Sequence, residues 1–239
     1  LGDGTTTQRA KPVAVATDTS LNGLVVSKIS MGYYGGHCVT TNGRCHGWGI
    51  NGGQIGDGTT TQRAKPVLVS NATSLSGKTV TDVSDRYDHT VFLCSDGTLH
   101  ACGTQYSSGN LGDGATGTQN RPVAVATDGV LSGKIITKMC AGVNNGGNCV
   151  DSNGVAYGWG YNGGYTIGDG SNTNRTKPVA TATDTSLNGK TVVGISTNNT
   201  CTMFICSDGT IHGCGANTNR QIGDGTNSVR SKPVATTMP

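Results

Sequence analysis

Nine cysteines are the most reactive side chains of this 239-residue chain, and their spacing predicts local disulfides. No CxxC pair and no CxxCH run occurs, which argues against a zinc site or haem attachment. Four segments each hold one local pair, and closing such short loops contributes about 2–3 kcal/mol apiece. The predicted pairs are Cys38 with Cys45, Cys94 with Cys102, Cys140 with Cys149, and Cys206 with Cys214. Cys201 is left over, either free or bonded between chains. The alternative is nine free, buried thiols that act as small apolar residues.

Basic residues gather in front of a recurring proline and make up nine of the 17 lysines and arginines. Repetition would place them along one rim, which suits an acidic protein or a polysaccharide. The alternative, which we favour, is that they balance the charges of nearby aspartates. The nine are Arg9, Lys11, Arg63, Lys65, Arg121, Arg175, Lys177, Arg230 and Lys232, and the aspartates are Asp3, Asp57, Asp113, Asp169 and Asp224.

These aspartates stand in Gly-Asp-Gly loops that lack the alternating oxygen ligands of a calcium loop. We expect each aspartate to accept backbone hydrogen bonds and hold its own turn. No phosphate-binding G-x-x-x-x-G-K-[ST] motif occurs. The histidines His37, His46, His89, His100 and His212 form no nucleophile–base set that stands apart from the repeats. The sequence therefore predicts no enzyme, no metal and no cofactor.

The positions just described recur with a period near 55 residues. A [LI]GDG tetrapeptide, followed by a basic residue, proline and valine, occurs five times, at 1–4, 55–58, 111–114, 167–170 and 222–225. Such spacing predicts one supersecondary unit copied in tandem, so residues 1–239 form a single tandem-repeat domain.

Composition indicates that the repeated unit is all-β. The chain has 39 glycines and no glutamate, and Thr and Val favour strands where Gly, Asn and Asp favour turns. Each of four units holds a short apolar strand, then a hairpin, then the proline-bearing segment, which belongs at a sheet edge because proline donates no hydrogen bond. We expect two-residue type I′ turns at the hairpin tips. The tips are Asn42-Gly43, Asp96-Gly97, Asn153-Gly154 and Asp208-Gly209.

Two stretches give this unit a family resemblance. Gly47–Val67, reading GWGINGGQIGDGTTTQRAKPV, resembles the signature of the regulator of chromosome condensation repeat family, and His89–Gly103 resembles that family's H-x-x-x-L-x-x-D-G hairpin. The resemblance covers essentially the whole chain and implies β-propeller blades of four antiparallel strands. Family members usually form closed seven-bladed propellers. This chain has four hairpin units and a surplus GDG-PV segment, so we expect either a closed propeller or an open stacked array.

A second departure is an alternation between units. The first and third hairpins end in Trp48 and Trp159, and the second and fourth end in Cys102 and Cys214. We expect the tryptophans to pack between blades. Two tryptophans are too few for the Trp cluster of the plant ultraviolet-B photoreceptor branch. The surplus segment could complete a blade of a neighbouring chain, which leads to a head-to-tail ring or filament.

Net charge and cysteine content indicate which partners and which location we expect for the protein. A net charge of +3 gives no indication of nucleic-acid binding, and no apolar run reaches membrane-spanning length. Cysteine usage favours a secreted or extracellular location. Sequons at Asn71, Asn174 and Asn198 are candidate glycosylation sites.

Two functions follow from these patterns. The first is an extracellular structural or adhesive repeat protein that is a homo-oligomer or polymer. The second is a monomeric propeller that binds a protein, as the resemblance implies for exchange on a small GTPase or for enzyme inhibition. A binding site should lie where loops differ between units, chiefly at Asp85–Asp88, Gln105–Asn110 and Val143–Gly147.

Overall fold

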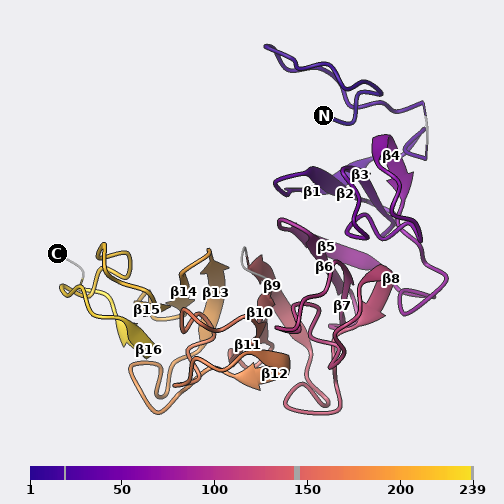
Figure 1. Ribbon diagram of the computed structural model, residues 1–239. Helices are drawn as coiled ribbons and strands as arrows, with labels where there is room; N and C mark the ends of the chain where they lie inside the picture. Colours follow the sequence, from indigo (N-terminus) through magenta and orange to yellow (C-terminus); the bar gives the residue numbers. More distant parts are fainter. Residues whose placement is uncertain (19, 143–145, 238–239) are drawn as a thin grey trace. The chain divides into compact units, whose positions relative to one another are not determined.

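A computed structural model describes residues 1–18, 20–142 and 146–237 of the chain (Figure 1). The described residues form sixteen β-strands and no helix. The predicted variable segment Val143–Gly147 therefore lies partly outside the described residues. The strands form four antiparallel sheets of four strands, each in sequence order. The all-β fold with four-stranded repeat units is confirmed.

The chain divides into two compact units, and each contains two of the sheets. Unit 1 consists of residues Leu1–Gln105 and Gly117–Ala124, and unit 2 of Tyr106–Thr116 and Val125–Pro239. In unit 1 the first sheet is β1 (Val26–Met31), β2 (Gly35–Thr40), β3 (Cys45–Gly49) and β4 (Arg63–Leu68), and the second is β5 (Val80–Asp85), β6 (His89–Cys94), β7 (Leu99–Gly103) and β8 (Gln119–Ala124). In unit 2 the third sheet is β9 (Ile136–Gly142), β10 (Gly146–Asp151), β11 (Ala156–Gly160) and β12 (Arg175–Ala180), and the fourth is β13 (Val192–Thr197), β14 (Cys201–Cys206), β15 (Ile211–Gly215) and β16 (Arg230–Ala235).

Proline determines which strand ends each sheet. Pro66, Pro122, Pro178 and Pro233 lie in β4, β8, β12 and β16, which are edge strands as predicted. The equivalent segment around Pro12 forms no strand. Its counterparts each pair with the third strand of their own sheet, and no strand of the described residues pairs with residues 9–14.

The hairpin tips differ from the predicted type I′ turns. Gly43 N–H donates to Thr40 O (2.8 Å), and Thr40 N–H donates to Arg44 O (2.8 Å), which encloses a three-residue loop. Gly43 has a φ of +77°, whereas Asn42 is not among the positive-φ residues. This is a type I turn followed by a left-handed glycine, and the other three tips have the same bonds. The type I′ prediction is wrong because only the glycine, and not the residue before it, takes a positive φ.

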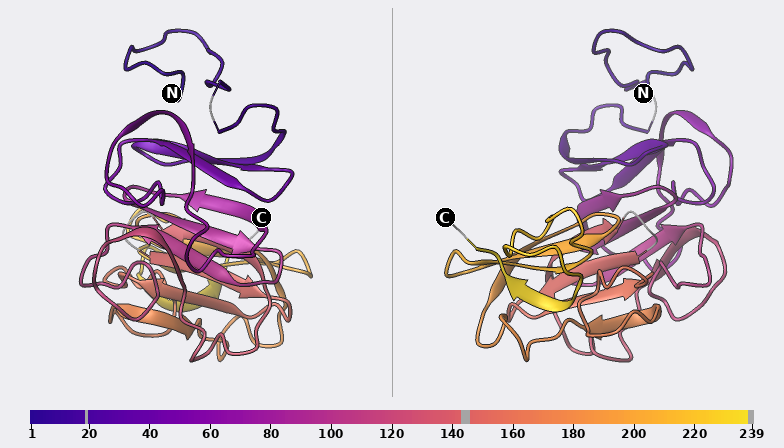
Figure 2. Two further views of the ribbon diagram at one scale, coloured as in Figure 1. Left: turned by 90° about the vertical axis from the view of Figure 1, so that its right-hand side faces the viewer. Right: turned by 60° about the vertical axis from the view of Figure 1, so that its left-hand side comes forward.

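The cores lie between the two sheets of each unit. In unit 1, Val39 of β2 packs in one cluster with Val80 and Val83 of β5. In unit 2, Val150 of β10 packs with Val192 of β13, and the partly buried Ile195 joins them. Figure 2 shows the strands of both units from two further directions. The sparse apolar residues are therefore shared between neighbouring sheets of one unit, as the low hydrophobic content requires.

Candidate functional site

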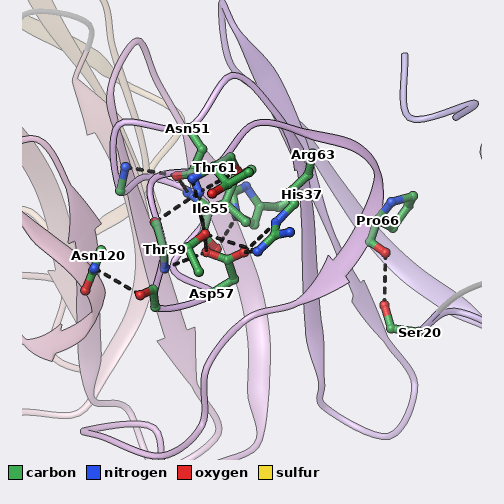
Figure 3. A network of polar contacts seen from close by, with 12 residues as sticks. Ser20, His37, Asn51, Ile55, Asp57, Thr59, Thr61, Arg63, Pro66 and Asn120 are labelled. Carbon is green, nitrogen blue, oxygen red and sulfur yellow. Dashed lines mark hydrogen bonds and ion pairs between the residues drawn. The ribbon is translucent and has the colours of Figure 1, made fainter. Parts of the chain in front are cut away.

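The GDG loops are held by a polar network centred on their aspartate (Figure 3). In the second loop Asp57 Oδ1 accepts from the backbone N–H of Thr59 (2.9 Å) and from Asn51 Nδ2 (3.3 Å). Its Oδ2 accepts from Arg63 Nε (2.7 Å). Burial raises the pKa of Asp57, but the hydrogen bonds from Thr59 and Arg63 outweigh it and hold that pKa below its ordinary value. Asp57 thus organises its own turn, as expected from the sequence.

The basic residues before each proline are mostly neutralised by neighbouring aspartates. Arg9, Arg63, Arg175 and Arg230 form ion pairs with the GDG aspartates of their own loops at 2.6–2.9 Å. Lys65, Lys177 and Lys232 pair with Asp18, Asp128 and Asp184. Lys11 and Arg121 form no ion pair among the described residues. The geometry favours charge balance over a basic rim for an acidic partner.

All nine cysteines are free thiols, so the four predicted disulfides are not formed. The strand register gives the reason. Cys38 lies opposite His46 while Cys45 lies opposite Val39, so their side chains point to opposite faces of the sheet, and Cys140 and Cys149 are offset in the same way. Cys94 ends β6, whereas Cys102 lies opposite Thr90 four residues away, or about 13 Å along the strand. Cys206 and Cys214 repeat that separation, which no disulfide spans.

The remaining cysteine and the three sequons have distinct surroundings. Cys201 is buried at the start of β14. Asn71 is exposed, and Asn174 uses its Oδ1 to accept from the N–H of Asn162 (2.9 Å). Asn198 is exposed, and its Oδ1 accepts from the N–H groups of Thr200 and Cys201 at 2.9 Å each. Glycosylation at these sites stays a prediction.

His100 and His212 are scaffold residues at equivalent positions. His100 Nδ1 lies 2.8 Å from Ser74 Oγ, and His212 Nδ1 lies 2.8 Å from Ser186 Oγ. Burial and then the charge of Lys78 lower the pKa of His100 to about 4. No group of three His, Cys, Asp or Glu side chains suited to a metal occurs among the described residues.

His37 stands apart from this repeat pattern. Its Nδ1 lies 2.7 Å from Asp85 Oδ1, and its Nε2 lies 3.3 Å from the Ile55 carbonyl oxygen, so both ring nitrogens face acceptors. Both side chains are almost fully buried. Burial alone lowers the pKa of His37, but the charge of Asp85 and the hydrogen bonds to it and to Ile55 outweigh that effect and raise the pKa. The pair joins β2 of the first sheet to β5 of the second, next to the loop that precedes β2 and the loop that follows β5.

Three exposed tyrosines gather at these loops. Tyr33 and Tyr34 lie between β1 and β2, and Tyr87 lies between β5 and β6. The rings of Tyr33 and Tyr87 stack with centroids 4.6 Å apart and an interplanar angle of 8°, and Tyr34 meets both edge-on at 4.8 and 5.4 Å. We call Tyr33, Tyr34 and Tyr87 the tyrosine cluster. Burial, then the neighbouring Tyr33 and Tyr34, raise the pKa of Tyr87.

A groove of about 360 Å³ begins at Tyr34. Its apolar lining comes from Leu1 and Ile50, and its polar lining comes from Thr5–Arg9 and Gln62–Arg63. Leu1 and Ile50 are exposed large apolar side chains. The tyrosine cluster and the groove together form a continuous surface of unit 1 that combines aromatic, aliphatic and hydrogen-bonding groups. This arrangement is suited to binding, and it brings no nucleophile next to a base.

Sequence reasoning found only part of this surface. The segment Asp85–Asp88, noted for its difference between repeats, contributes Tyr87. Tyr33 and Tyr34 were missed, although the same comparison of loops would have found them. The fourth unit has Asn198, Asn199 and Thr200 in the equivalent loop, which are polar and exposed.

Four-stranded antiparallel sheets repeated in tandem define the chain as a protein built of β-propeller blades. No family model matches it. The chain is 27% identical over 217 residues to the human E3 ubiquitin-protein ligase HERC2, a match that covers 90% of this chain and 4% of HERC2. It is 27% identical over 216 residues to the Arabidopsis thaliana ultraviolet-B receptor UVR8, which covers 90% of this chain and 46% of UVR8.

Solved structures show the same fold. Human WBSCR16 has a TM-score of 0.77 at 21% identity, over 90% of this chain and 53% of that one. Yeast RCC1 (Prp20), solved bound to Kap60, has a TM-score of 0.74 at 16% identity, over 94% of this chain and 51% of that one. The comparisons support an RCC1-like repeat protein, and this chain spans less than half the length of HERC2 and UVR8. None of them supports an extracellular location, a disulfide framework or a filament. Among the described residues, no helix is long and apolar enough to cross a membrane.

Proposed function

We propose that this chain is a non-catalytic, RCC1-like propeller module that binds a protein partner through the tyrosine cluster and the adjoining groove. The observation that carries the proposal is the set of three mutually packed, exposed tyrosines on loops where the repeats differ.

The repeats themselves provide the comparison that gives this observation its weight. The fourth sheet makes the equivalent loop with Asn198, Asn199 and Thr200, so the fold does not need tyrosine there. Exposed aromatic side chains cost solubility, and clustered apolar surface on a soluble protein marks an interaction site. Tyrosine is also enriched among residues that dominate binding free energy. The cluster is therefore better explained by binding than by stability.

The stacking of the rings prepares this surface for a partner. Tyr33 and Tyr87 hold each other in place, and Tyr34 packs against both, so little side-chain entropy is left to lose on binding. Beneath them the buried pair of His37 and Asp85 links the two strands that carry the loops. The groove beside Tyr34 offers room for an extended segment of the partner, with Ile50 as an apolar contact.

The named relatives support protein binding as the function class. Yeast RCC1 (Prp20) was solved bound to Kap60, and a second structure of Prp20p is described with its binding properties to Gsp1p and histones. HERC2 is named an E3 ubiquitin-protein ligase, and this chain matches only 4% of it. An extracellular structural role lacks comparable support.

The test compares the wild-type chain with Tyr33→Ser/Tyr87→Ser. Partners retained by the immobilised wild-type chain are purified and titrated calorimetrically against both proteins. Removing two central aromatic contacts should weaken binding by at least about 30-fold, which corresponds to roughly 2 kcal/mol.

Tyr161→Ser provides the matched control, because Tyr161 is about as exposed as Tyr34 and Tyr87 but lies in unit 2 outside the cluster. Its affinity should equal that of the wild-type chain. Equal binding by the wild-type and double-variant proteins would refute the proposed site.

A further inference from the structure

A pocket of about 180 Å³ lies where the two sheets of unit 1 meet. It is lined by the tip of the β2–β3 hairpin, the end of β4 and the start of β5. Gly35 pairs with Gly49 at the end of the hairpin that adjoins the tyrosine cluster. Val39 pairs with Cys45 at the other end, next to the tip and the pocket. The pocket is therefore separate from the surface proposed for protein binding.

The buried lining of the pocket is apolar. Val69, Leu75 and Val80 are buried members of the core cluster of unit 1, and the half-buried Leu68 lies at the same pocket. An apolar cavity of about 150 Å³ holds a molecule the size of benzene, whereas pockets for drug-sized ligands measure about 300–1,000 Å³. The volume therefore fits a compact ligand, about as large as a benzene ring with one substituent.

The exposed lining of the pocket is polar and positively charged. Arg44 and Lys78 are its two cations, and none of its described lining residues is a carboxylate. Lys78 forms an ion pair with Asp96. The guanidinium of Arg44 forms no ion pair or hydrogen bond among the described residues. The pocket thus has one uncompensated positive charge beside an apolar surface, a combination that is complementary to an amphipathic anion.

Unit 2 repeats the backbone around this pocket without the arginine. Val80 N–H donates to Gly43 O (3.0 Å), and the equivalent bond of unit 2 has the same length. The counterpart of Arg44 is Val155, which follows the hairpin tip of the third sheet. The fold therefore does not need an arginine at this position, and the charge is a property of unit 1 alone.

We propose that this pocket binds a small organic monocarboxylate that carries a compact apolar group, such as a monocyclic aromatic acid. The carboxylate lies against the guanidinium of Arg44, which can donate two parallel hydrogen bonds to it. The apolar group lies over Leu68 and Val69. Burial and then the charge of Asp85 raise the pKa of Cys45, so its thiol lines the pocket as a neutral group and the ligand is held without a covalent bond.

A chemical-shift titration of the ¹⁵N-labelled full chain with sodium benzoate, at constant ionic strength, tests the proposal. We expect a Kd of about 1 mM or tighter, in keeping with so small a ligand. Shift changes should concentrate in residues 42–45, 68–71 and 75–80, while the equivalent segments of unit 2, 153–156, 180–183 and 187–192, stay unchanged. Benzamide has the same ring without the charge, and it should bind at least about tenfold more weakly.

Arg44→Gln should weaken benzoate binding by at least about tenfold, because it removes the uncompensated charge. Lys28→Gln is the matched control, since Lys28 is exposed in β1 of the same unit and does not line the pocket. It should bind benzoate like the wild-type chain. Leu68→Ala introduces the residue that unit 2 has at this position, Ala180, and should weaken binding by at least about threefold because apolar surface is lost.

Three results would overturn the proposal: no shift change in the pocket segments at about 20 mM benzoate, equal binding of benzoate and benzamide, or equal binding of benzoate by the wild-type and Arg44→Gln chains. The Tyr33→Ser/Tyr87→Ser variant should bind benzoate like the wild-type chain. Weaker binding by this variant would show that the acid occupies the tyrosine cluster instead of the pocket.

Discussion

His37 and Asp85 show how a single pair of residues departs from the repeat and links two of its copies. The equivalents of His37 in the other sheets are Val91, Asn148 and Met203, none of which can carry a charge. Both nitrogens of His37 face acceptors, so the charged imidazolium satisfies the site and the neutral ring leaves one acceptor unpaired. Loss of either partner leaves a buried, uncompensated group, which costs about 3–5 kcal/mol.

The stability of unit 1 should depend on pH through this pair. Because the pKa of His37 is raised in the folded state, the stabilisation is complete below the unfolded value of about 6.5 and is lost as pH rises through the folded pKa. Urea unfolding at about pH 5.5 and about pH 9 should show a smaller advantage of the wild-type chain over His37→Gln/Asp85→Asn at the higher pH. A constant difference would mean that the buried histidine is neutral.

At the scale of the element, the aspartate of the GDG loop stabilises its own loop, and this stabilisation is lost in acid. Burial raises the pKa of Asp224, but hydrogen bonds from Thr226, Arg230 and Asn217 outweigh it and lower that pKa to about 2. A depressed carboxylate pKa contributes stability that is present above the unfolded value of about 3.9 and is lost as pH falls through the folded pKa. The thermal midpoint of the wild-type chain should therefore approach that of Asp224→Asn as pH falls from about 5 to about 2.

The third GDG loop shows whether a GDG loop needs its arginine. It has Gln119 where the other loops have arginine, yet it retains the same backbone bond, from Gly114 N–H to Thr176 O (2.9 Å). Arg230→Gln should consequently shift the midpoint much less than Asp224→Asn. An arginine variant as unstable as the aspartate variant would contradict the central place of the aspartate.

The alternation of tryptophan and cysteine has a packing reason that register makes plain. Trp159 lies opposite Gly147, and Cys214 lies opposite Thr202. A Cβ on Gly147 would come within 2.3 Å of the Trp159 ring. The third sheet therefore pairs a large tryptophan with a glycine, and the fourth sheet pairs a smaller cysteine with a threonine, so that the two pairs fill a similar volume.

A double-mutant cycle in the third sheet tests this exchange. Gly147→Thr should destabilise unit 2 by about 1–3 kcal/mol because it overpacks the ring. Gly147→Thr/Trp159→Cys, which copies the fourth sheet, should recover part of that loss. The measurement is urea unfolding of the four proteins, and strictly additive effects would show that the two positions do not act together.

Across the whole molecule, the sequence predicts the architecture far better than the chemistry of its sites. The recurring glycines, aspartates and prolines allow the strands and the sheet edges to be predicted from the sequence, because these residues act locally. Glycine and aspartate determine turn geometry, and proline lacks a backbone hydrogen-bond donor. The disulfide pairs and the type I′ turns depend on register, which changes when one residue enters a hairpin loop. The tyrosine cluster joins residues more than 50 positions apart, so its stacking emerges only when two sheets lie side by side.

The tyrosine cluster also gives the most direct test of the proposed function. Hydrogen–deuterium exchange of the chain, free and bound to its purified partner, reports where binding protects the backbone. We predict that protection concentrates in residues 32–36, 49–50 and 86–89, with unit 2 unchanged. Protection confined to unit 2, with these loops exchanging as in the free chain, would contradict a partner site at the tyrosine cluster.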